Sequence, residues 1–402
     1  MAFDFLTVYD RHGMDALAVD AIGRVEGAPH APQDGYSSIP MWVADMNFGT
    51  APAVTDAIRA RLEHPIFGYF FPPQEYFDAI KNWQASHNNA HDVEDRHIGY
   101  ENGVLGGLIS TVSAYCQPGD SVLVHSPTYV GFTSCLTAAG FNIVHSPLIP
   151  DNDGVYHMDY EDMDRVLEES GAKVAIFCSP HNPTGRVWHR EEIEAAMEIY
   201  AKHDCIVVSD EIWSDIIHPG CTHVPTQSVS EDARNRTVAL YAPSKTFNIA
   251  GIVGAYHIIY NDDLRARVEA ASKKSHYNDA HVLSVHALIG GYSSEGNAWL
   301  QELNDVLAHN VQRARDFFAQ CAPEISIARS AGTYMLWLDA TAWCAKHKKS
   351  IDELLEAGWR VGVGWQDGRP FHGDCHIRMN VALPSALLEE ALGRLAEHVF
   401  VE

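Results

Sequence analysis

The spacing of hydrophobic positions changes along this 402-residue chain and predicts which segments are strands and which are helices. Between residues 121 and 260, short apolar runs alternate with segments in which apolar residues recur every three or four positions. Runs of the first kind are typical of buried strands, and the others of amphipathic helices. The predicted strands are 121–127, 141–148, 173–180, 205–211, 237–241 and 254–260. The predicted helices between them are 130–139, 160–171 and 191–204. This alternation predicts an α/β fold with a mostly parallel central sheet.

The pattern differs on both sides of this block. Residues 1–50 lack a long periodic element, and amphipathic helices are predicted at 52–62 and 74–88. Beyond Asp262 the pattern is helical to about residue 321. The remaining predicted elements are strands at 333–340 and 375–382 and helices near 350–357 and 385–399. We therefore expect three parts: an N-terminal segment (1–50) that packs with the small domain, a large domain (51–290), and a smaller α+β domain (291–402).

Charge and cysteine content exclude several classes of protein. Lys and Arg number 28 against 53 Asp and Glu, so the formal net charge is −25, which disfavours binding to nucleic acid and to anionic membranes. The eight cysteines form no CxxC pair, and no window approaches the ~20 apolar residues of a membrane helix. The N-terminus has no apolar signal core. We expect a cytoplasmic protein with reduced thiols.

A histidine-rich stretch raises the question of a metal. His87 and His91 have the spacing of two ligands on one helical face, and His97 follows closely. The neighbouring Asn, Asp and Glu residues favour a solvated polar turn instead, and the chain has no HExxH motif. We expect no metal site, and the structure has to decide between the two interpretations.

A lysine at a predicted strand end is the strongest candidate for chemistry. Lys245 follows the apolar run 237–241 and lies between Ser244 and Thr246. Ligands of open α/β sheets bind outside the carboxyl ends of the strands. A buried amine there can form a Schiff base with an aldehyde cofactor if burial lowers its pKa from ~10.4 toward neutrality. The alternative is an ordinary lysine paired with a surface carboxylate.

Other predicted strands deliver polar or aromatic groups at equivalent positions. Tyr129, Asn182 and Asp210 each follow the end of an apolar run, as Lys245 does. Because the carboxyl ends of parallel strands share one edge of the sheet, these four groups are expected to converge. A buried Asp210 needs a cation, which a pyridinium, an Arg or a Lys supplies. Asn182 offers a donor to a phenolate, and the Asn182-Pro183 bond is a candidate for the cis form. Tyr129 either stacks on a flat heterocycle or only packs beneath a helix.

A glycine-rich helix start precedes this block. Gly103, Gly106 and Gly107 open an apolar helix, where free backbone N–H groups attract an anion such as phosphate. Glycines at such a position also serve close packing alone, so this motif by itself leaves both interpretations open.

Three motifs in order identify a family resemblance. SPHNPTGRVW (179–188), SDEIWSDI (209–216) and APSKTFNIAG (242–251) resemble the fold type I pyridoxal phosphate enzymes, the aminotransferase-like superfamily, over residues from about 35 to the C-terminus. The resemblance implies that Lys245 forms the Schiff base with pyridoxal 5'-phosphate, Asp210 keeps the ring nitrogen protonated, Asn182 contacts the ring hydroxyl and Tyr129 stacks on the ring. It also implies a phosphate site at Ser244 and at the backbone of three residues: Gly103, Val104 and Leu105. Arg378, in CHIRMNVALP (375–384), matches the arginine that binds the substrate α-carboxylate.

Further motifs resemble one branch of this superfamily, the cystathionine β-lyases of the MalY/PatB type. These motifs are MWVADMNF (41–48), the FGY ending in Tyr69, and GWQDGRPFHG (364–373). The resemblance implies a homodimer in which Tyr69 reaches the phosphate of the neighbouring subunit. It implies a carbon–sulfur β-lyase that cleaves cystathionine or other cysteine S-conjugates, amino-acid thioethers, to a thiol, pyruvate and ammonia.

Three positions refine this interpretation. Val253 stands eight residues after the lysine, where many aminotransferases carry a phosphate-binding arginine. Trp213 replaces the usual His or Tyr beside the cofactor and cannot titrate, and Val19 replaces a Trp that is common in the lyases. Two alternatives remain: an aminotransferase, which shares every step up to the carbanion, and a regulatory or binding protein that keeps the fold without the activity.

Overall fold

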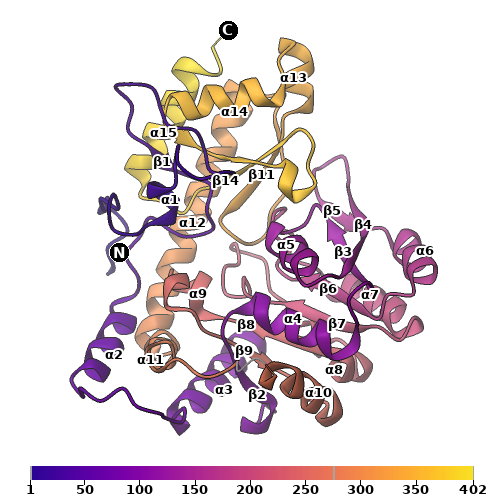
Figure 1. Ribbon diagram of the computed structural model, residues 1–402. Coiled ribbons are helices and arrows are strands. Elements are labelled where there is room, and N and C mark those ends of the chain that lie inside the picture. Colours follow the sequence, from indigo (N-terminus) through magenta and orange to yellow (C-terminus); the bar gives the residue numbers. More distant parts are fainter. Residues whose placement is uncertain (1, 275–276, 402) are drawn as a thin grey trace.

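The computed structural model describes residues 2–274 and 277–401, and its largest sheet has eight strands within those residues (Figure 1). The strands, in spatial order, are β2 (Ile98–Glu101), β9 (Ala255–Ile258), β8 (Thr237–Tyr241), β7 (Ile206–Asp210), β6 (Val174–Cys178), β3 (Ser121–Ser126), β4 (Asn142–Pro150) and β5 (Tyr156–Met158). The five from β8 to β4 are parallel, while β9 and β5 run antiparallel to their neighbours. The predicted α/β class with a mostly parallel sheet is confirmed.

Helices cover both faces of this sheet, which explains the unbroken apolar runs of its central strands. In β6, Val174 and Ile176 pack on one side while Ala175 and Phe177 pack on the other, as the period of two requires. The first side is covered by α4 (Val104–Tyr115), α5 (Val130–Ala138) and α10 (Asp262–Lys273). The second side is covered by α6 (Tyr160–Ser170), α7 (Arg190–Lys202) and α8 (Glu231–Arg236).

The last elements of the chain, in yellow tones, gather at the end of the molecule opposite to β2 and α10, and the orange helix α12 (Ser294–Cys321) runs from beside α11 (Val282–Gly291) toward them (Figure 1). Their antiparallel sheet has the order β10 (Ser326–Ile327), β11 (Met335–Asp339), β14 (His376–Asn380) and β13 (Gln366–Asp367). The helices of this part of the chain are α12 (Ser294–Cys321), α13 (Thr341–His347), α14 (Ile351–Arg360) and α15 (Ser385–His398). Strands β11 and β14 are the two predicted at 333–340 and 375–382, and their register places Trp337 opposite Arg378.

The N-terminal segment contacts this smaller sheet region. Strand β1 (Ile39–Pro40) pairs in parallel with β12 (Val363–Gly364). Helices α2 (Pro52–Leu62), α3 (Gln74–Asn88) and α11 (Val282–Gly291) share a core with Phe5 and with Trp299 of α12. The domain boundaries at 50 and 290 stay predictions. The backbone N–H of Thr128 donates to the carbonyl of Phe371 (2.9 Å), which joins the β3–α5 loop to the turn before β14.

The sequence pattern missed several short elements. Strands β2 (IGYE) and β5 (YHM) mix polar and apolar positions and so lack the continuous apolar run that marks the central strands, and α13 has only seven residues. Within the described residues, no helix has the length and apolar character needed to cross a membrane.

Candidate active site

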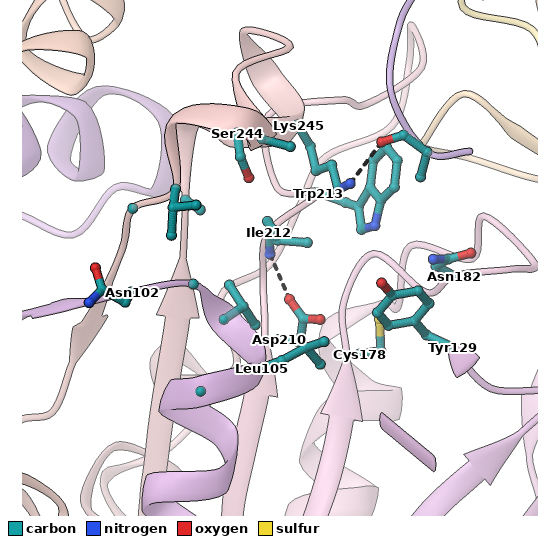
Figure 2. Close-up of a pocket in the computed structure, with 18 residues that line it drawn as sticks. Asn102, Leu105, Tyr129, Cys178, Asn182, Asp210, Ile212, Trp213, Ser244 and Lys245 are labelled. Carbon is teal, nitrogen blue, oxygen red and sulfur yellow. Dashed lines mark hydrogen bonds between the residues drawn. The ribbon is translucent and has the colours of Figure 1, made fainter. Parts of the chain in front are cut away.

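A cavity of about 310 Å³ opens at the carboxyl ends of the parallel strands (Figure 2). Nine of the predicted site residues line it: Gly103, Val104, Leu105, Tyr129, Asn182, Asp210, Trp213, Ser244 and Lys245. They come from the start of α4, the start of α5, the loop after β6, the end of β7 and the loop that follows it, and the turn after β8. The structure therefore brings together the distant segments whose convergence the sequence predicts. Arg378 and Tyr69 do not line this cavity.

Lys245 lies on a single helical turn, α9 (Pro243–Thr246), directly after β8. Its Nζ donates a hydrogen bond to the carbonyl oxygen of Ala44 at 2.7 Å. Burial and, to a smaller extent, the nearby Arg378 charge lower the pKa of Lys245 to about 8, although the charges of Asp45 and Asp210 act in the opposite direction. A part of this amine is thus unprotonated near neutral pH, as nucleophilic attack on an aldehyde requires.

Asp210 is the last residue of β7, and it is buried. Its Oδ1 accepts a hydrogen bond from the backbone N–H of Ile212 at 3.1 Å (Figure 2). Burial raises the pKa of Asp210 to about 7, although the Ile212 hydrogen bond and the Lys245 charge oppose this rise. Within residues 2–274 and 277–401 this carboxylate forms no ion pair. A pyridinium N–H in the cavity would supply the missing cation.

Tyr129 and Asn182 face the same cavity from neighbouring loops (Figure 2). The Tyr129 ring lies so close to Gly131 that a Cβ on this glycine would come within 2.3 Å of it. The Asn182-Pro183 bond is cis, as the sequence suggests. Asn182 Oδ1 accepts from Arg378 Nη1 at 3.1 Å, and its amide nitrogen makes no hydrogen bond within the described part of the chain. That nitrogen is available to a ring oxygen in the cavity.

The start of α4 forms an anion-binding corner of the cavity. Its N-cap, Gly103, has φ +105° and no capping side chain, and Val104 and Leu105 begin the helix at the cavity wall. Backbone N–H groups at such a helix start can bind an anion. The hydroxyl of Tyr277 donates to the Gly103 carbonyl at 2.6 Å, and a Cβ on Gly106 would lie 1.9 Å from that hydroxyl oxygen. Gly106 therefore serves close packing. Val253 lines the cavity and has φ +53°. Because its side chain is that of a valine, no guanidinium enters the cavity from this position.

Arg378 lies on β14 and is only 3% exposed. Besides Asn182, its guanidinium donates to the carbonyl of Trp42 at 2.8 Å and to Gln366 Oε1 at 2.5 Å, and it lies 4.3 Å from the ring centre of Phe371. All of these partners are neutral, and burial lowers the pKa of Arg378 to about 10. A buried guanidinium without a carboxylate in the described residues suits an anionic ligand.

Tyr69 is fully exposed in the loop between α2 and α3. It borders a separate surface hollow with Phe67, Val282 and Leu283. The chain does not bring Tyr69 to its own cavity, so the predicted role of this residue requires a second subunit.

Sequence reasoning missed two groups near the lysine. The Ala44 carbonyl accepts from Lys245, and Tyr334 Oη donates to the same oxygen at 3.1 Å. A backbone carbonyl leaves no signature in the residue type, so nothing in the sequence singled out Ala44. No signal pointed to Tyr334 either.

The histidine-rich stretch makes separate contacts. His87 stacks on Trp83 with its ring centre 3.8 Å away, His91 bonds to Asn89, and the ring of His97 accepts from the Glu94 backbone. Among the described residues, no three His, Cys, Asp or Glu side chains are grouped so that they could hold a metal ion.

Comparison with known proteins decides the family. Residues 42–395 match the class I and II aminotransferase family model. The chain belongs to the class I and II aminotransferase family. Within this family it is 33% identical to the cystathionine β-lyase PatB of Bacillus subtilis, over 96% of this chain and 97% of that protein.

Solved structures of family members agree. The PLP-bound C-S lyase of Staphylococcus hominis superimposes with a TM-score of 0.88 at 30% identity, covering 100% of this chain and 98% of the lyase. Cystalysin of Treponema denticola, which contains pyridoxal 5'-phosphate, gives a TM-score of 0.90 at 29% identity, covering 99% and 98%. The family and the aminotransferase-like fold predicted from the motifs are confirmed.

Proposed function

We propose that this protein is a pyridoxal-phosphate-dependent carbon–sulfur β-lyase. It cleaves cystathionine or another cysteine S-conjugate to a thiol, pyruvate and ammonia. The observation that carries the proposal is the similarity to lyases along almost the whole chain, combined with an amine and a carboxylate that line one cavity. A buried guanidinium, that of Arg378, is hydrogen-bonded to Asn182 of the same cavity wall. The position of Val253, without an arginine side chain, also agrees with the lyase branch.

The cavity residues suit pyridoxal phosphate group by group. Lys245 would bond to its aldehyde carbon, Asp210 would hold its ring nitrogen as a cation, and Asn182 and Trp213 would donate to its ring oxygen. Tyr129 would stack on the ring, and Ser244 with the N–H groups of Gly103, Val104 and Leu105 would bind the phosphate. When bound, the cofactor supplies an electron sink for negative charge at the substrate Cα.

The protein's own groups bind the substrate and move its proton. Arg378 would take the substrate carboxylate through two parallel hydrogen bonds, which fixes the direction of the bonds at Cα. Lys245, once released by the incoming amine, would remove the Cα proton, because its pKa of about 8 matches a general base near neutral pH. A thiolate then leaves from Cβ.

The same proposal includes an active site to which two subunits contribute. The loop 66–71 exposes four large apolar side chains, Ile66, Phe67, Tyr69 and Phe71, and an exposed apolar cluster of this kind marks an interaction surface. We propose a homodimer in which this loop crosses to the partner and Tyr69 binds the phosphate in the partner's cavity.

The eight cysteines are free, and a cytoplasmic location stays part of the proposal.

A direct assay separates the candidate functions. The purified chain loaded with pyridoxal phosphate receives cystathionine and no keto acid. A β-lyase releases pyruvate continuously, in parallel with a free thiol. An aminotransferase stops after one half-reaction per site, and a protein that only binds ligands releases nothing. Either of the last two results would overturn the proposal.

A further inference from the structure

Five consecutive carbonyl oxygens, those of residues 42–46, each accept a hydrogen bond from a side chain of another segment. Arg378 Nη2 donates to residue 42 (2.8 Å), Asn380 Nδ2 to residues 43 (2.6 Å) and 45 (2.5 Å), Lys245 Nζ to residue 44 (2.7 Å), and Asn248 Nδ2 to residue 46 (2.9 Å). A backbone whose successive carbonyls are all taken in this way has little freedom to move.

The donors come from the two motifs that carry the proposed chemistry. Arg378 and Asn380 stand two residues apart on β14, and Lys245 and Asn248 stand three apart around α9. Asn380 is 1% exposed, and Asn248 Oδ1 also accepts from the backbone N–H of Met46 at 2.9 Å. The segment 42–46 is therefore fixed from both sides, and the position of the Ala44 carbonyl oxygen is fixed with it.

This oxygen is the one hydrogen-bond partner of Lys245 Nζ within the described residues, and it is neutral. Tyr334 Oη donates to the same oxygen at 3.1 Å. The Tyr334 ring is fully buried and packs edge-on against Trp213, whose ring centre lies 4.7 Å away, so its hydroxyl is held in place. Lys245 Nζ lies 5.7 Å from the ring centre of Trp213.

A carbonyl that accepts from an amine favours the ammonium form, because the charged donor gives the stronger hydrogen bond. A second donor to the same oxygen withdraws part of that stabilisation. Burial and the charges of Arg378, Asp45 and Asp210 also act on this amine. We propose that the Ala44 carbonyl shifts the acid–base balance of Lys245 toward the ammonium form, that the hydrogen bond from Tyr334 weakens this effect, and that Asn380 keeps the oxygen in place. Tyr334 and Asn380 are thus positioning residues. Their importance for turnover rests on the proposed lyase function, in which Lys245 must act as a free base.

Trace acetylation of the full chain without cofactor tests the proposal. The protein reacts with a small amount of acetic anhydride at a series of pH values, and mass spectrometry of the Lys245 peptide gives the midpoint of its titration. Tyr334→Phe should raise this midpoint by about 0.5 to 1 pH unit, because the carbonyl then serves the lysine alone. Asn380→Ala should lower it, because burial of the amine is then less well compensated.

Tyr160→Phe is the matched control, since Tyr160 Oη also donates to a backbone carbonyl, that of Glu192 at 3.3 Å, in another part of the fold. It should leave the Lys245 midpoint unchanged. Opposite shifts in Tyr334→Phe and Asn380→Ala support the proposal, since general loosening would move both variants the same way. A Tyr334→Phe midpoint equal to that of the control would overturn it, as would shifts in one direction.

A second measurement connects the lysine to turnover. In the cofactor-loaded enzyme, the acidic limb of the pH profile of kcat for pyruvate release should move upward in Tyr334→Phe by the same amount, with KM little changed. The labelling experiment needs no lyase activity. If the wild-type chain releases no pyruvate while the midpoints shift as expected, the proposed function fails and the role of the Ala44 carbonyl stands.

Discussion

Arg378 and Asn182 are joined by a buried hydrogen bond of 3.1 Å, from Nη1 to Oδ1, although 196 positions separate them in the sequence. The bond fixes which way the Asn182 amide points, so its nitrogen is left for the cavity. It also links the smaller sheet, which carries Arg378, to the cavity of the parallel sheet. A ligand that binds the guanidinium therefore acts close to the residues that would hold the cofactor ring.

Arg378→Lys tests the carboxylate site. Lysine keeps the charge but cannot make two parallel hydrogen bonds, so kcat/KM for cystathionine should fall roughly 10- to 100-fold. A thioether of cysteamine, which lacks the carboxylate, should react equally slowly with both enzymes. Arg369→Lys is the control, because Arg369 lies nearby on the surface and pairs with Asp352 and Asp367. Equal losses on both substrates would show that Arg378 does not bind the carboxylate.

Asp210→Asn tests the burial of an unpaired carboxylate. The pKa of Asp210 rises from 3.8 to about 7 in the folded chain, so the folded state holds a proton that the unfolded state has released between these pH values. Its contribution to stability is complete below pH ~4 and is lost as the pH rises through about 7. Without cofactor, the melting temperature of the asparagine variant should lie a few degrees above that of the wild type at pH 8. At pH 5 the difference between the two melting temperatures should be much smaller.

Thermal unfolding of both proteins at the two pH values measures this difference. With pyridoxal phosphate added, the wild type should unfold at the higher temperature, because only the carboxylate holds the ring nitrogen as a cation. A wild-type chain that equals the variant at pH 8 would contradict the raised pKa.

Lys245→Ala should remove the covalent link to the cofactor. The visible absorbance band of the loaded wild type should be absent after dialysis of the variant, and pyruvate release should fall by several orders of magnitude. Lys273→Ala is the control, because this lysine lies exposed on α10. A variant that keeps both the band and the activity would remove Lys245 from the site.

Mixed dimers test the role of Tyr69. Tyr69→Ala and Lys245→Ala should each be nearly inactive alone. When the two are unfolded and refolded together, a mixed dimer contains one cavity with its own Lys245 and the partner's intact tyrosine, so activity should return. If Tyr69 acted within its own chain, every cavity would lack one of the two residues and the mixture would stay inactive. Size-exclusion chromatography with light scattering checks that the species are dimers.

Much of the fold and site could be predicted because the signals are local. Continuous apolar runs such as 237–241 occur where both faces of a strand are covered, and the residues after such runs meet at one edge of a parallel sheet. That reasoning placed Tyr129, Asn182, Asp210 and Lys245 at one cavity without any contact information. The sequence could not predict that β9 runs antiparallel to β8, because an apolar run has the same pattern in parallel and antiparallel strands.

By itself, the sequence determined the order of the elements, the family and the set of chemical groups at the strand ends, because side-chain type and spacing encode them. The tertiary structure alone decided which groups touch. It paired Arg378 with Asn182, placed Tyr334 and Lys245 on one carbonyl, and left Tyr69 outside the cavity of its own chain. Every backbone carbonyl has the same chemistry, so only the packing of distant segments selects the one at Ala44 to hold the lysine.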